Sequence, residues 1–129
     1  MSADLRLEAR TTLGELELDV ALHVAPGDCL ALAGPSGAGK SSVLRIVAGL
    51  LQPREGSVRC GPDTWLDTSR GVNVAPDHRR CGYVFQEYAL FPHLTAWQNV
   101  AFGLRDVPRA ERRDRAVPLL ERFGLGRLA

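Results

Sequence analysis

One nine-residue stretch restricts the possible folds of this chain more than any other: GPSGAGKSS, at residues 34–42. It follows an apolar run, CLALA at 29–33, and it precedes KSSVLRIVAGLL at 40–51, whose apolar residues recur at helical spacing. A continuous apolar run is typical of a strand that is covered on both faces. We therefore expect a buried strand, a glycine-rich loop and an amphipathic helix in succession, which predicts an α/β fold.

The single lysine of the chain lies in this stretch, although the sequence contains fifteen arginines. Residues 34–41 match GxxxxGK[ST], the Walker A pattern of phosphate-binding loops. Glycines let the backbone approach a phosphate, and the loop and the helix start turn N–H groups towards it. The ammonium of Lys40 is a compact charge that suits the β- and γ-phosphates, where the planar guanidinium of arginine would be too wide. The hydroxyl of Ser41 is placed to bind Mg²⁺. The residues expected to hold the nucleotide are Gly34, Pro35, Ser36, Gly37, Ala38, Gly39, Lys40, Ser41 and Ser42.

The composition argues against several other classes of protein. The formal net charge of +1 gives no general attraction to nucleic acid, so we expect no nucleic-acid partner. The three cysteines are widely spaced without a CxxC pair, which disfavours a disulfide framework or a zinc site and fits a cytosolic chain. The histidines show no ligand spacing. The N-terminus lacks the apolar core of a signal peptide, and no apolar stretch approaches the ~20 residues of a membrane span.

Strands are predicted on both sides of the glycine-rich stretch. Apolar and polar residues alternate at 5–10 and 14–24, the pattern of half-buried strands. A Gly-Pro-Asp turn within 56–67 predicts two further short strands, and CGYVFQ at 81–86 predicts another. We expect Arg79 and Arg80, just before this last segment, to form a solvated basic pair.

Helices are predicted in the last third of the chain. Thr95 is placed to cap a short helix that carries Trp97, Val100 and Ala101. The segment 107–126 predicts a second helix, with Pro108 in its first turn, Gly124 at its C-terminal cap and a charged face at 109–115. Because Pro118 removes a backbone donor, it should kink this helix or split it in two.

The longest specific pattern is CGYVFQEYALFPHLTAWQNVAFGL, at residues 81–104. It closely resembles the Q-loop region of the ATPases of ABC transporters. Together with GPSGAGKSS and RIVAGLLQPREGSV at 45–58, it fits the importer branch that serves sulfate, molybdate, iron and polyamines. The resemblance covers residues 5–128 and implies a partial P-loop NTPase core with an N-terminal antiparallel β subdomain. Residues 1–129 would then form one incomplete ABC ATPase domain, from the Walker A loop through the Q-loop to the start of the helical subdomain.

The same resemblance implies roles for residues outside the loop. Gln86 matches the Q-loop glutamine, so it would act with Lys40 in catalysis and with Ser41 as a ligand of Mg²⁺. Residues 87–97 match the segment that grips the coupling helix of the membrane subunit. Composition alone favours a local apolar core for this segment, whereas the resemblance favours a groove for that helix. The residues of the expected groove are Tyr88, Leu90, Phe91 and Leu94.

The resemblance implies an ATP-binding subunit that couples hydrolysis of MgATP to the import of a solute. Such a subunit would act as a homodimer with a permease, at the cytoplasmic face of the membrane. Residues 65–86 are most similar to the corresponding stretch of molybdate-type ATPases, which favours molybdate or another oxyanion as the cargo.

Two features depart from the family pattern. Residues 1–30 contain no aromatic side chain on which adenine could stack. The sequence also has no LSGGQ signature and no apolar run that ends in Asp-Glu, the Walker B pattern, so we expect the 129 residues alone to be inactive. A second hypothesis is therefore a truncated, catalytically inactive nucleotide-binding or interaction fragment. The Q-loop stretch disfavours a P-loop kinase for small molecules.

Overall fold

A computed structural model describes residues 3–87 and 89–129 of the chain. The chain divides into two compact units, with the boundary between Tyr83 and Val84. The first unit contains a β-sheet and one α-helix, and the second unit is helical. Within the described ranges, no helix is both long enough and apolar enough to cross a membrane.

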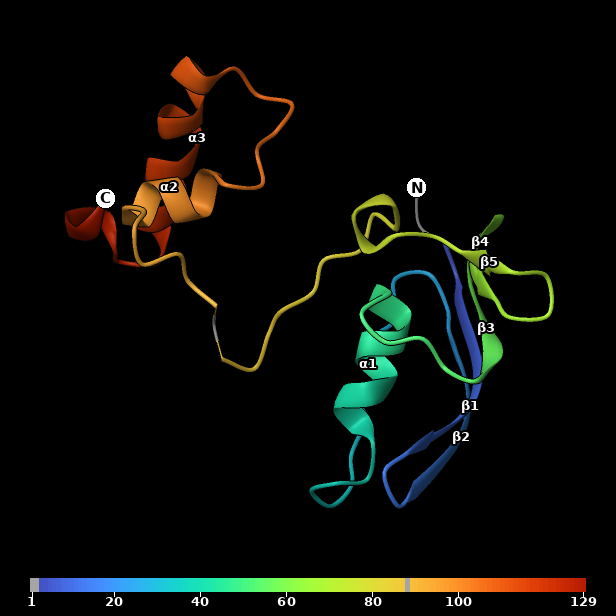
Figure 1. The fold of residues 1–129 in the computed structure, drawn as a ribbon. Helices are drawn as coiled ribbons and strands as arrows, with labels where there is room; N and C mark the ends of the chain where they lie inside the picture. Colours follow the sequence, from blue (N-terminus) through green and yellow to red (C-terminus); the bar gives the residue numbers. More distant parts are fainter. Residues whose placement is uncertain (1–2, 88) are drawn as a thin grey trace. The chain divides into compact units, whose positions relative to one another are not determined.

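The first unit is built on one antiparallel sheet, with the strand order β2-β1-β3-β4-β5 (Figure 1). Because successive side chains of a strand point to opposite faces, the alternating sequence pattern fixes which residues face the core. The predicted strands at 5–10 and 14–24 and the two short strands within 56–67 are confirmed. The strands are β1 (Leu5–Leu13), β2 (Leu16–Val24), β3 (Glu55–Cys60), β4 (Asp63–Asp67) and β5 (Val72–Asn73).

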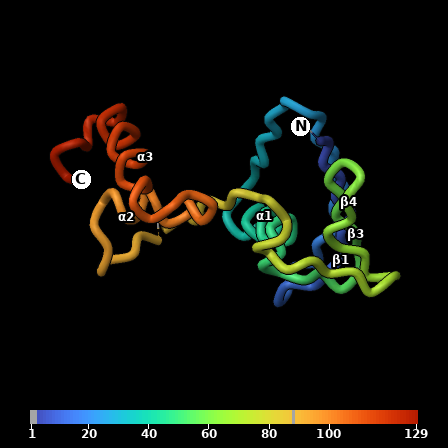
Figure 2. Tube along the Cα trace, turned by 90° about the horizontal axis from the view of Figure 1, so that it is seen from above, coloured from blue at the N-terminus to red at the C-terminus, as the bar shows by residue number. Residues whose placement is uncertain are grey.

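The core of the first unit lies between the inner face of the sheet and helix α1 (Lys40–Ala48) (Figure 2). In the sheet, Leu7 lies opposite Leu22 of β2 and Val58 of β3. Full burial of one such side chain contributes about 1.5–3 kcal/mol, so this layer is the main source of stability for the unit. The buried residues of the core cluster are Leu7, Ala9, Leu18, Val43, Ile46, Val58, Trp65 and Leu66.

The outer face of the sheet carries polar and charged residues in complementary pairs. Arg10 lies opposite Asp19, with its Nε 3.6 Å from the carboxylate. Thr12 donates a hydrogen bond of 2.8 Å to the carboxylate of Glu17. Exposed pairs of this kind contribute little stability individually. They nevertheless favour the observed register, because a slip of one residue would turn the charged side chains towards the core.

Helix α1 ends earlier than the sequence pattern predicts. The apolar periodicity extends to residue 51, whereas α1 ends at Ala48 because Gly49 adopts a left-handed conformation with φ 85°. The N–H of Gly49 donates to the carbonyls of Arg45 and Ile46 and so closes the helix. Of the expected apolar stripe, Val43 and Ile46 are buried, whereas Leu50 lies beyond the helix and is exposed.

Two predicted strands are absent from the described residues. The segments 29–33 and 81–86 contain no strand, and Leu30 and Val84 within them are 49% and 91% exposed. A strand that is covered on both faces needs hydrogen-bonded neighbours for its backbone groups. Neither segment pairs with the five-stranded sheet. The predictions of a buried strand at 29–33 and of a strand at 81–86 are therefore wrong for this chain.

The second unit contains helices α2 (Ala96–Ala101) and α3 (Arg109–Arg122), which contact each other, and a 3₁₀ turn, η2 (Gly126–Leu128). The prediction that Thr95 caps the short helix is confirmed. Its hydroxyl accepts from the N–H of Gln98, and the Gln98 side chain accepts from the N–H of Thr95, which completes a capping box. The buried residues of these helices are Ala101, Ala116 and Leu120.

Helix α3 is continuous, although Pro118 lies within it. The proline removes one backbone donor, but it does not split the helix in two. Pro108 is the N-cap residue just before the first helical residue, and Gly124 follows the last turn with φ 72°. The two ends of the predicted helix are thus close to their expected positions.

Candidate functional site

The glycine-rich loop curls tightly before the start of α1. The N–H of Ala38 donates to the carbonyl of Pro35 at 3.2 Å, which closes a turn. Gly37 and Gly39 have φ values of 82° and 89°, in the left-handed region that other residues rarely adopt. A Cβ atom at Gly39 would also be crowded, because it would lie 3.1 Å from Cδ1 of Leu18, which would have to shift slightly. The two glycines therefore set the path of the loop and its fit against β2.

The side chain of Lys40 folds back over the loop. Its Nζ donates to the carbonyl oxygen of Gly34 and, at 3.1 Å, to that of Pro35. No other residue of 34–42 carries a positive side chain, so this ammonium supplies the charge of the loop. It is held within hydrogen-bonding distance of the loop backbone.

The start of α1 offers backbone donors beside the ammonium. The N–H of Val43 donates to the carbonyl of Gly39 at 3.0 Å, as the first turn of the helix requires. The N–H groups of Lys40, Ser41 and Ser42 precede this bond, so the helix itself provides no acceptor for them. These donors and the positive end of the helix dipole favour an anion. Loop, helix start and ammonium thus fit a phosphate group in charge and in donor chemistry.

The two expected ligands of Mg²⁺ lie in different units. Ser41 is exposed in the first turn of α1, and Gln86 is exposed in the second unit. A serine hydroxyl and a glutamine amide both offer the oxygen atoms that Mg²⁺ accepts. These two oxygen donors suit Mg²⁺, and the binding of one ion by both Ser41 and Gln86 stays a prediction.

Arg79 contradicts the expectation of a solvated basic pair. Arg80 is exposed, but Arg79 is only 1% exposed. Its guanidinium donates to four oxygen atoms at 2.8–3.1 Å. Burial lowers the pKa of Arg79, although arginine stays protonated in proteins. Sequence reasoning missed this residue, because an arginine pair before an apolar segment gives no sign of which member is buried.

The segment expected to bind a membrane subunit is partly exposed. Leu90 is 73% exposed, whereas Leu94 is half-buried. The ring of Phe91 lies against that of Phe102, with a centroid distance of 4.4 Å. Tyr88, the remaining residue of the expected groove, lies outside the described residues. The exposure of Leu90 does not fit a closed local core, and the groove stays a prediction.

Asn99 organises this segment and was not singled out from the sequence. Its Oδ1 accepts from the N–H of Phe91 at 2.9 Å, and its Nδ2 donates to the carbonyls of Phe91, Leu94 and Thr95 at 2.9–3.2 Å. Asparagine is unfavourable inside helices because its side chain competes for backbone groups. An asparagine within a short predicted helix is therefore a signal that could have indicated this role.

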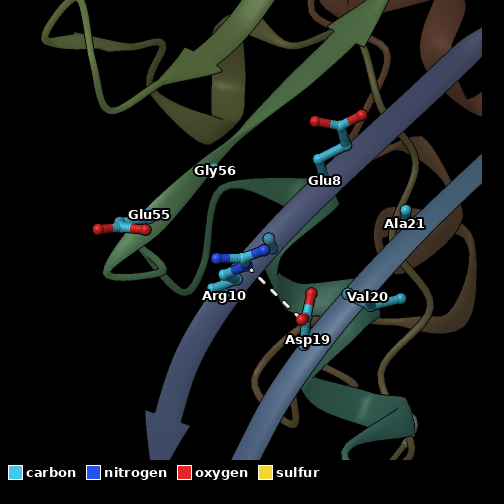
Figure 3. Close-up of a pocket in the computed structure, with 8 residues that line it drawn as sticks. Glu8, Arg10, Asp19, Val20, Ala21, Glu55 and Gly56 are labelled. Carbon is cyan, nitrogen blue, oxygen red and sulfur yellow. Dashed lines mark ion pairs between the residues drawn. The ribbon is translucent and has the colours of Figure 1, made fainter.

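A second candidate site is a concavity on the outer face of the sheet (Figure 3). Strands β1, β2 and β3 contribute its charged residues, and the ion pair between Arg10 and Asp19 crosses it. Within the described ranges, no group of three or more His, Cys, Asp or Glu side chains could hold a metal ion. The concavity contains no residue of the glycine-rich loop at 34–42, which is called the phosphate loop from here on. Its charged residues are Glu8, Arg10, Asp19 and Glu55. The loop is the stronger candidate, because donors and charge converge there.

A family model described as ABC transporter matches residues 18–129. The chain belongs to the ABC transporter family. The predicted resemblance is thereby confirmed.

Two solved structures are also similar to the chain over most of its length. A dimeric ATP-binding cassette, in a post-hydrolysis state bound to ADP and Pi, has a TM-score of 0.69 and 32% identity over 91% of this chain and 56% of that one. An Atm1-family ABC exporter with ATP bound has a TM-score of 0.72 at 23% identity, over 98% of this chain and 21% of that one. The expected ABC ATPase-like fold is confirmed by these matches.

Curated members of the ABC transporter family with similar sequences are named molybdenum import ATP-binding proteins. The protein of Paramagnetospirillum magneticum is 44% identical over 94% of this chain and 33% of its own length. That of Mycobacterium tuberculosis strain H37Rv is 48% identical over 76% of this chain and 27% of its own length. That of Pseudomonas aeruginosa is 47% identical over 84% and 30%, respectively. The chain thus spans about a third of the length of these relatives.

Proposed function

We propose that the chain is the nucleotide-binding part of an ABC importer ATPase, and that its phosphate loop binds MgATP. The observation that carries the proposal is the loop itself. Two glycines at positive φ, one ammonium and the first N–H groups of α1 converge on the same short stretch. The similar cassettes that were solved with ADP and Pi or with ATP support a nucleotide as the ligand.

Each part of the loop has a role in this proposal. The N–H groups at the start of α1 hold the β-phosphate, since they lack helical acceptors. Lys40 turns from the loop carbonyls towards the β- and γ-phosphates. Ser41 offers its hydroxyl to Mg²⁺, which supplies Lewis-acid stabilisation of the phosphates when it is bound. Gln86 joins this ligand set when its segment approaches the loop.

The names and assemblies of similar proteins support a proposal for the cargo and the partners. We propose molybdate or a related oxyanion as the transported solute, because the curated relatives are named as molybdenum import proteins. A dimer of ATPase subunits is proposed because one similar cassette was solved as a dimer. We propose that a permease binds near residues 87–97, where Leu90 is exposed, and that the protein acts at the cytoplasmic face of the membrane.

The 129 residues alone are expected to bind the nucleotide without turnover. The sequence contains no Asp-Glu pair at the end of an apolar run, so it lacks a glutamate in the position that polarises the attacking water. Steady release of phosphate by the purified chain, sensitive to substitution of Lys40, would contradict this proposal. The alternative of an inactive nucleotide-binding fragment makes the same prediction for the isolated chain. Molybdate uptake by a complete transporter that includes the chain distinguishes the two.

Substitution of the single lysine tests the nucleotide site. A unit charge about 4 Å from a phosphate contributes about 4 kcal/mol at an effective dielectric constant of about 20, and solvent screening reduces this value at an open loop. We therefore expect Lys40→Ala to weaken binding of MgATP at least about tenfold, or about 1.4 kcal/mol. Lys40→Arg should not restore binding, because the guanidinium is planar and wider. Equilibrium binding of a fluorescent ATP analogue with Mg²⁺ measures the effect.

Arg45→Ala is the matched control for the lysine variant. Arg45 lies in the last turn of the same helix, so its removal changes the net charge equally but at the other end of α1. Its affinity for the analogue should remain within about twofold of the wild type. Equal affinity of wild type and Lys40→Ala would rule out the proposed phosphate site.

A further inference from the structure

Arg79 is a buried cation whose charge is balanced by neutral oxygen atoms. Its side chain is 1% exposed, and in the described part of the chain no ion pair includes it. A buried charge without good partners is costly, whereas a guanidinium with several well-placed acceptors is tolerated. The acceptors lie in two separate segments, the end of α1 and residues 73–74, so the Arg79 side chain links these segments.

On one side, the guanidinium holds the end of the helix that carries Lys40. Nη1 donates to the carbonyl of Ile46 at 3.0 Å and to that of Val47 at 3.1 Å. These groups lie in the last turn of α1, where helical donors run out and a cation complements the helix dipole. Gly49 leaves room for this contact, because a Cβ atom there would lie 2.8 Å from Nε of Arg79.

On the other side, the same guanidinium holds the segment that leads to Gln86. Nε donates to the carbonyl of Val74 at 2.8 Å, and Nη2 donates to Oδ1 of Asn73 at 3.0 Å. Asn73 is the last residue of β5, and the 3₁₀ turn η1 (Pro76–His78) follows it. The planar fork of arginine offers five N–H donors and can therefore serve the four acceptors on both sides at once, whereas an ammonium offers only three donors.

We propose that Arg79 is a positioning residue for nucleotide binding. It fixes the C-terminal end of α1 to residues 73–79, and α1 in turn fixes the phosphate loop at its other end. A helix of nine residues is about 14 Å long and transmits a displacement of one end to the other. This inference rests on the proposed function, since the nucleotide loop is what Arg79 positions.

The test compares Arg79→Met with Arg80→Met. Methionine fills much of the same space without leaving an unpaired charge, so the variant separates the lost contacts from a buried-charge defect. At equal folded fractions, we expect Arg79→Met to bind MgATP about fivefold more weakly or worse. In the absence of nucleotide, the amides of residues 36–42 should exchange with deuterium at least about fivefold faster. Arg80→Met, at the exposed neighbour, should change neither quantity.

The two readouts separate the inference from the proposed function. If the wild type binds no MgATP, the proposed function fails, and the exchange of residues 36–42 alone decides whether Arg79 holds the loop. Unchanged exchange of these amides in folded Arg79→Met overturns the inference. Wild-type affinity in a variant with faster exchange also overturns it, because the loop would then not depend on Arg79 for binding.

A glycine pair keeps the inference testable if Arg79→Met does not fold. Gly49→Ala would push the guanidinium away from the end of α1, whereas Gly27→Ala places a methyl group in open space. The two glycines have φ values of 85° and 80°, so the backbone strain is matched. We expect faster exchange of residues 36–42 in Gly49→Ala and not in Gly27→Ala. The same rate in both variants would overturn the inference.

Discussion

Gly56 shows, at the scale of single residues, how the approach of two strands selects an amino acid. It lies on β3 opposite Ala9 of β1. A Cβ atom at Gly56 would lie 2.3 Å from the carbonyl oxygen of Glu8, which is a backbone atom in the middle of a paired strand. The neighbouring strand cannot move aside without weakening the ladder, so the position requires glycine.

We expect Gly56→Ala to lower the free energy of unfolding by about 3 kcal/mol, because it forces β1 and β3 apart. Urea unfolding followed by tryptophan fluorescence measures this change, since Trp65 is buried in the same unit. Gly82→Ala is the control, because its Cβ would meet no atom within 4 Å. An equally small effect of both substitutions would show that the strands can separate freely.

Single residues also show how far the sequence is informative. Lys40 and its glycines could be predicted, because a short local pattern demands those residues at that spacing. Arg79 could not, since its partners Ile46 and Val47 lie more than thirty positions earlier and are backbone carbonyls, which leave no pattern in the sequence. Asn99 differs from Arg79, because its partners are backbone groups within eight positions and an asparagine inside a short predicted helix is a local signal.

At the scale of elements, local patterns predict the strands and helices that pair or cap within a short range. Strands β1 and β2 are adjacent in sequence and in the sheet, and their alternation fixes the inner face. The segments 29–33 and 81–86 are also apolar, but neither pairs with a strand of the described sheet. An apolar run indicates that a segment would be stable as a strand buried on both faces. Such a strand forms only where neighbouring strands can pair with it, and the run itself does not supply these neighbours.

The capping box of α2 gives a prediction at this scale. Thr95→Ala removes the hydroxyl that accepts from Gln98 N–H and should lower the stability of the second unit by about 1 kcal/mol. Thr95→Ser keeps the hydroxyl and should retain most of that stability. Thermal unfolding followed by circular dichroism at the helical band compares the variants. A wild-type transition in Thr95→Ala would show that packing of α2 on α3 is sufficient without the cap.

At the scale of the whole molecule, the chain behaves as two compact units with a boundary after Tyr83. The sequence predicted one incomplete domain over 1–129, and this remains a prediction. Near the boundary, residues 81–85 form no helix or strand, and Val84 is almost fully exposed. Such segments are preferred sites of proteolysis, because an exposed backbone without regular secondary structure is accessible to a protease.

We expect brief digestion with chymotrypsin to cut first after Phe85, which is half exposed in this segment. Trp65, which is buried in β4, is the internal control and should be cut only after unfolding. Mass spectrometry of the first fragments identifies the site. An initial cut at Trp65 would show that the first unit opens before the boundary does.

The inward fold of the Lys40 side chain has a thermodynamic consequence. The amine already satisfies part of its donor capacity with oxygens of Gly34 and Pro35. An arriving triphosphate must therefore exchange one set of partners for another, so the heat released should be modest and much of the driving force should come from liberated water and counter-ions.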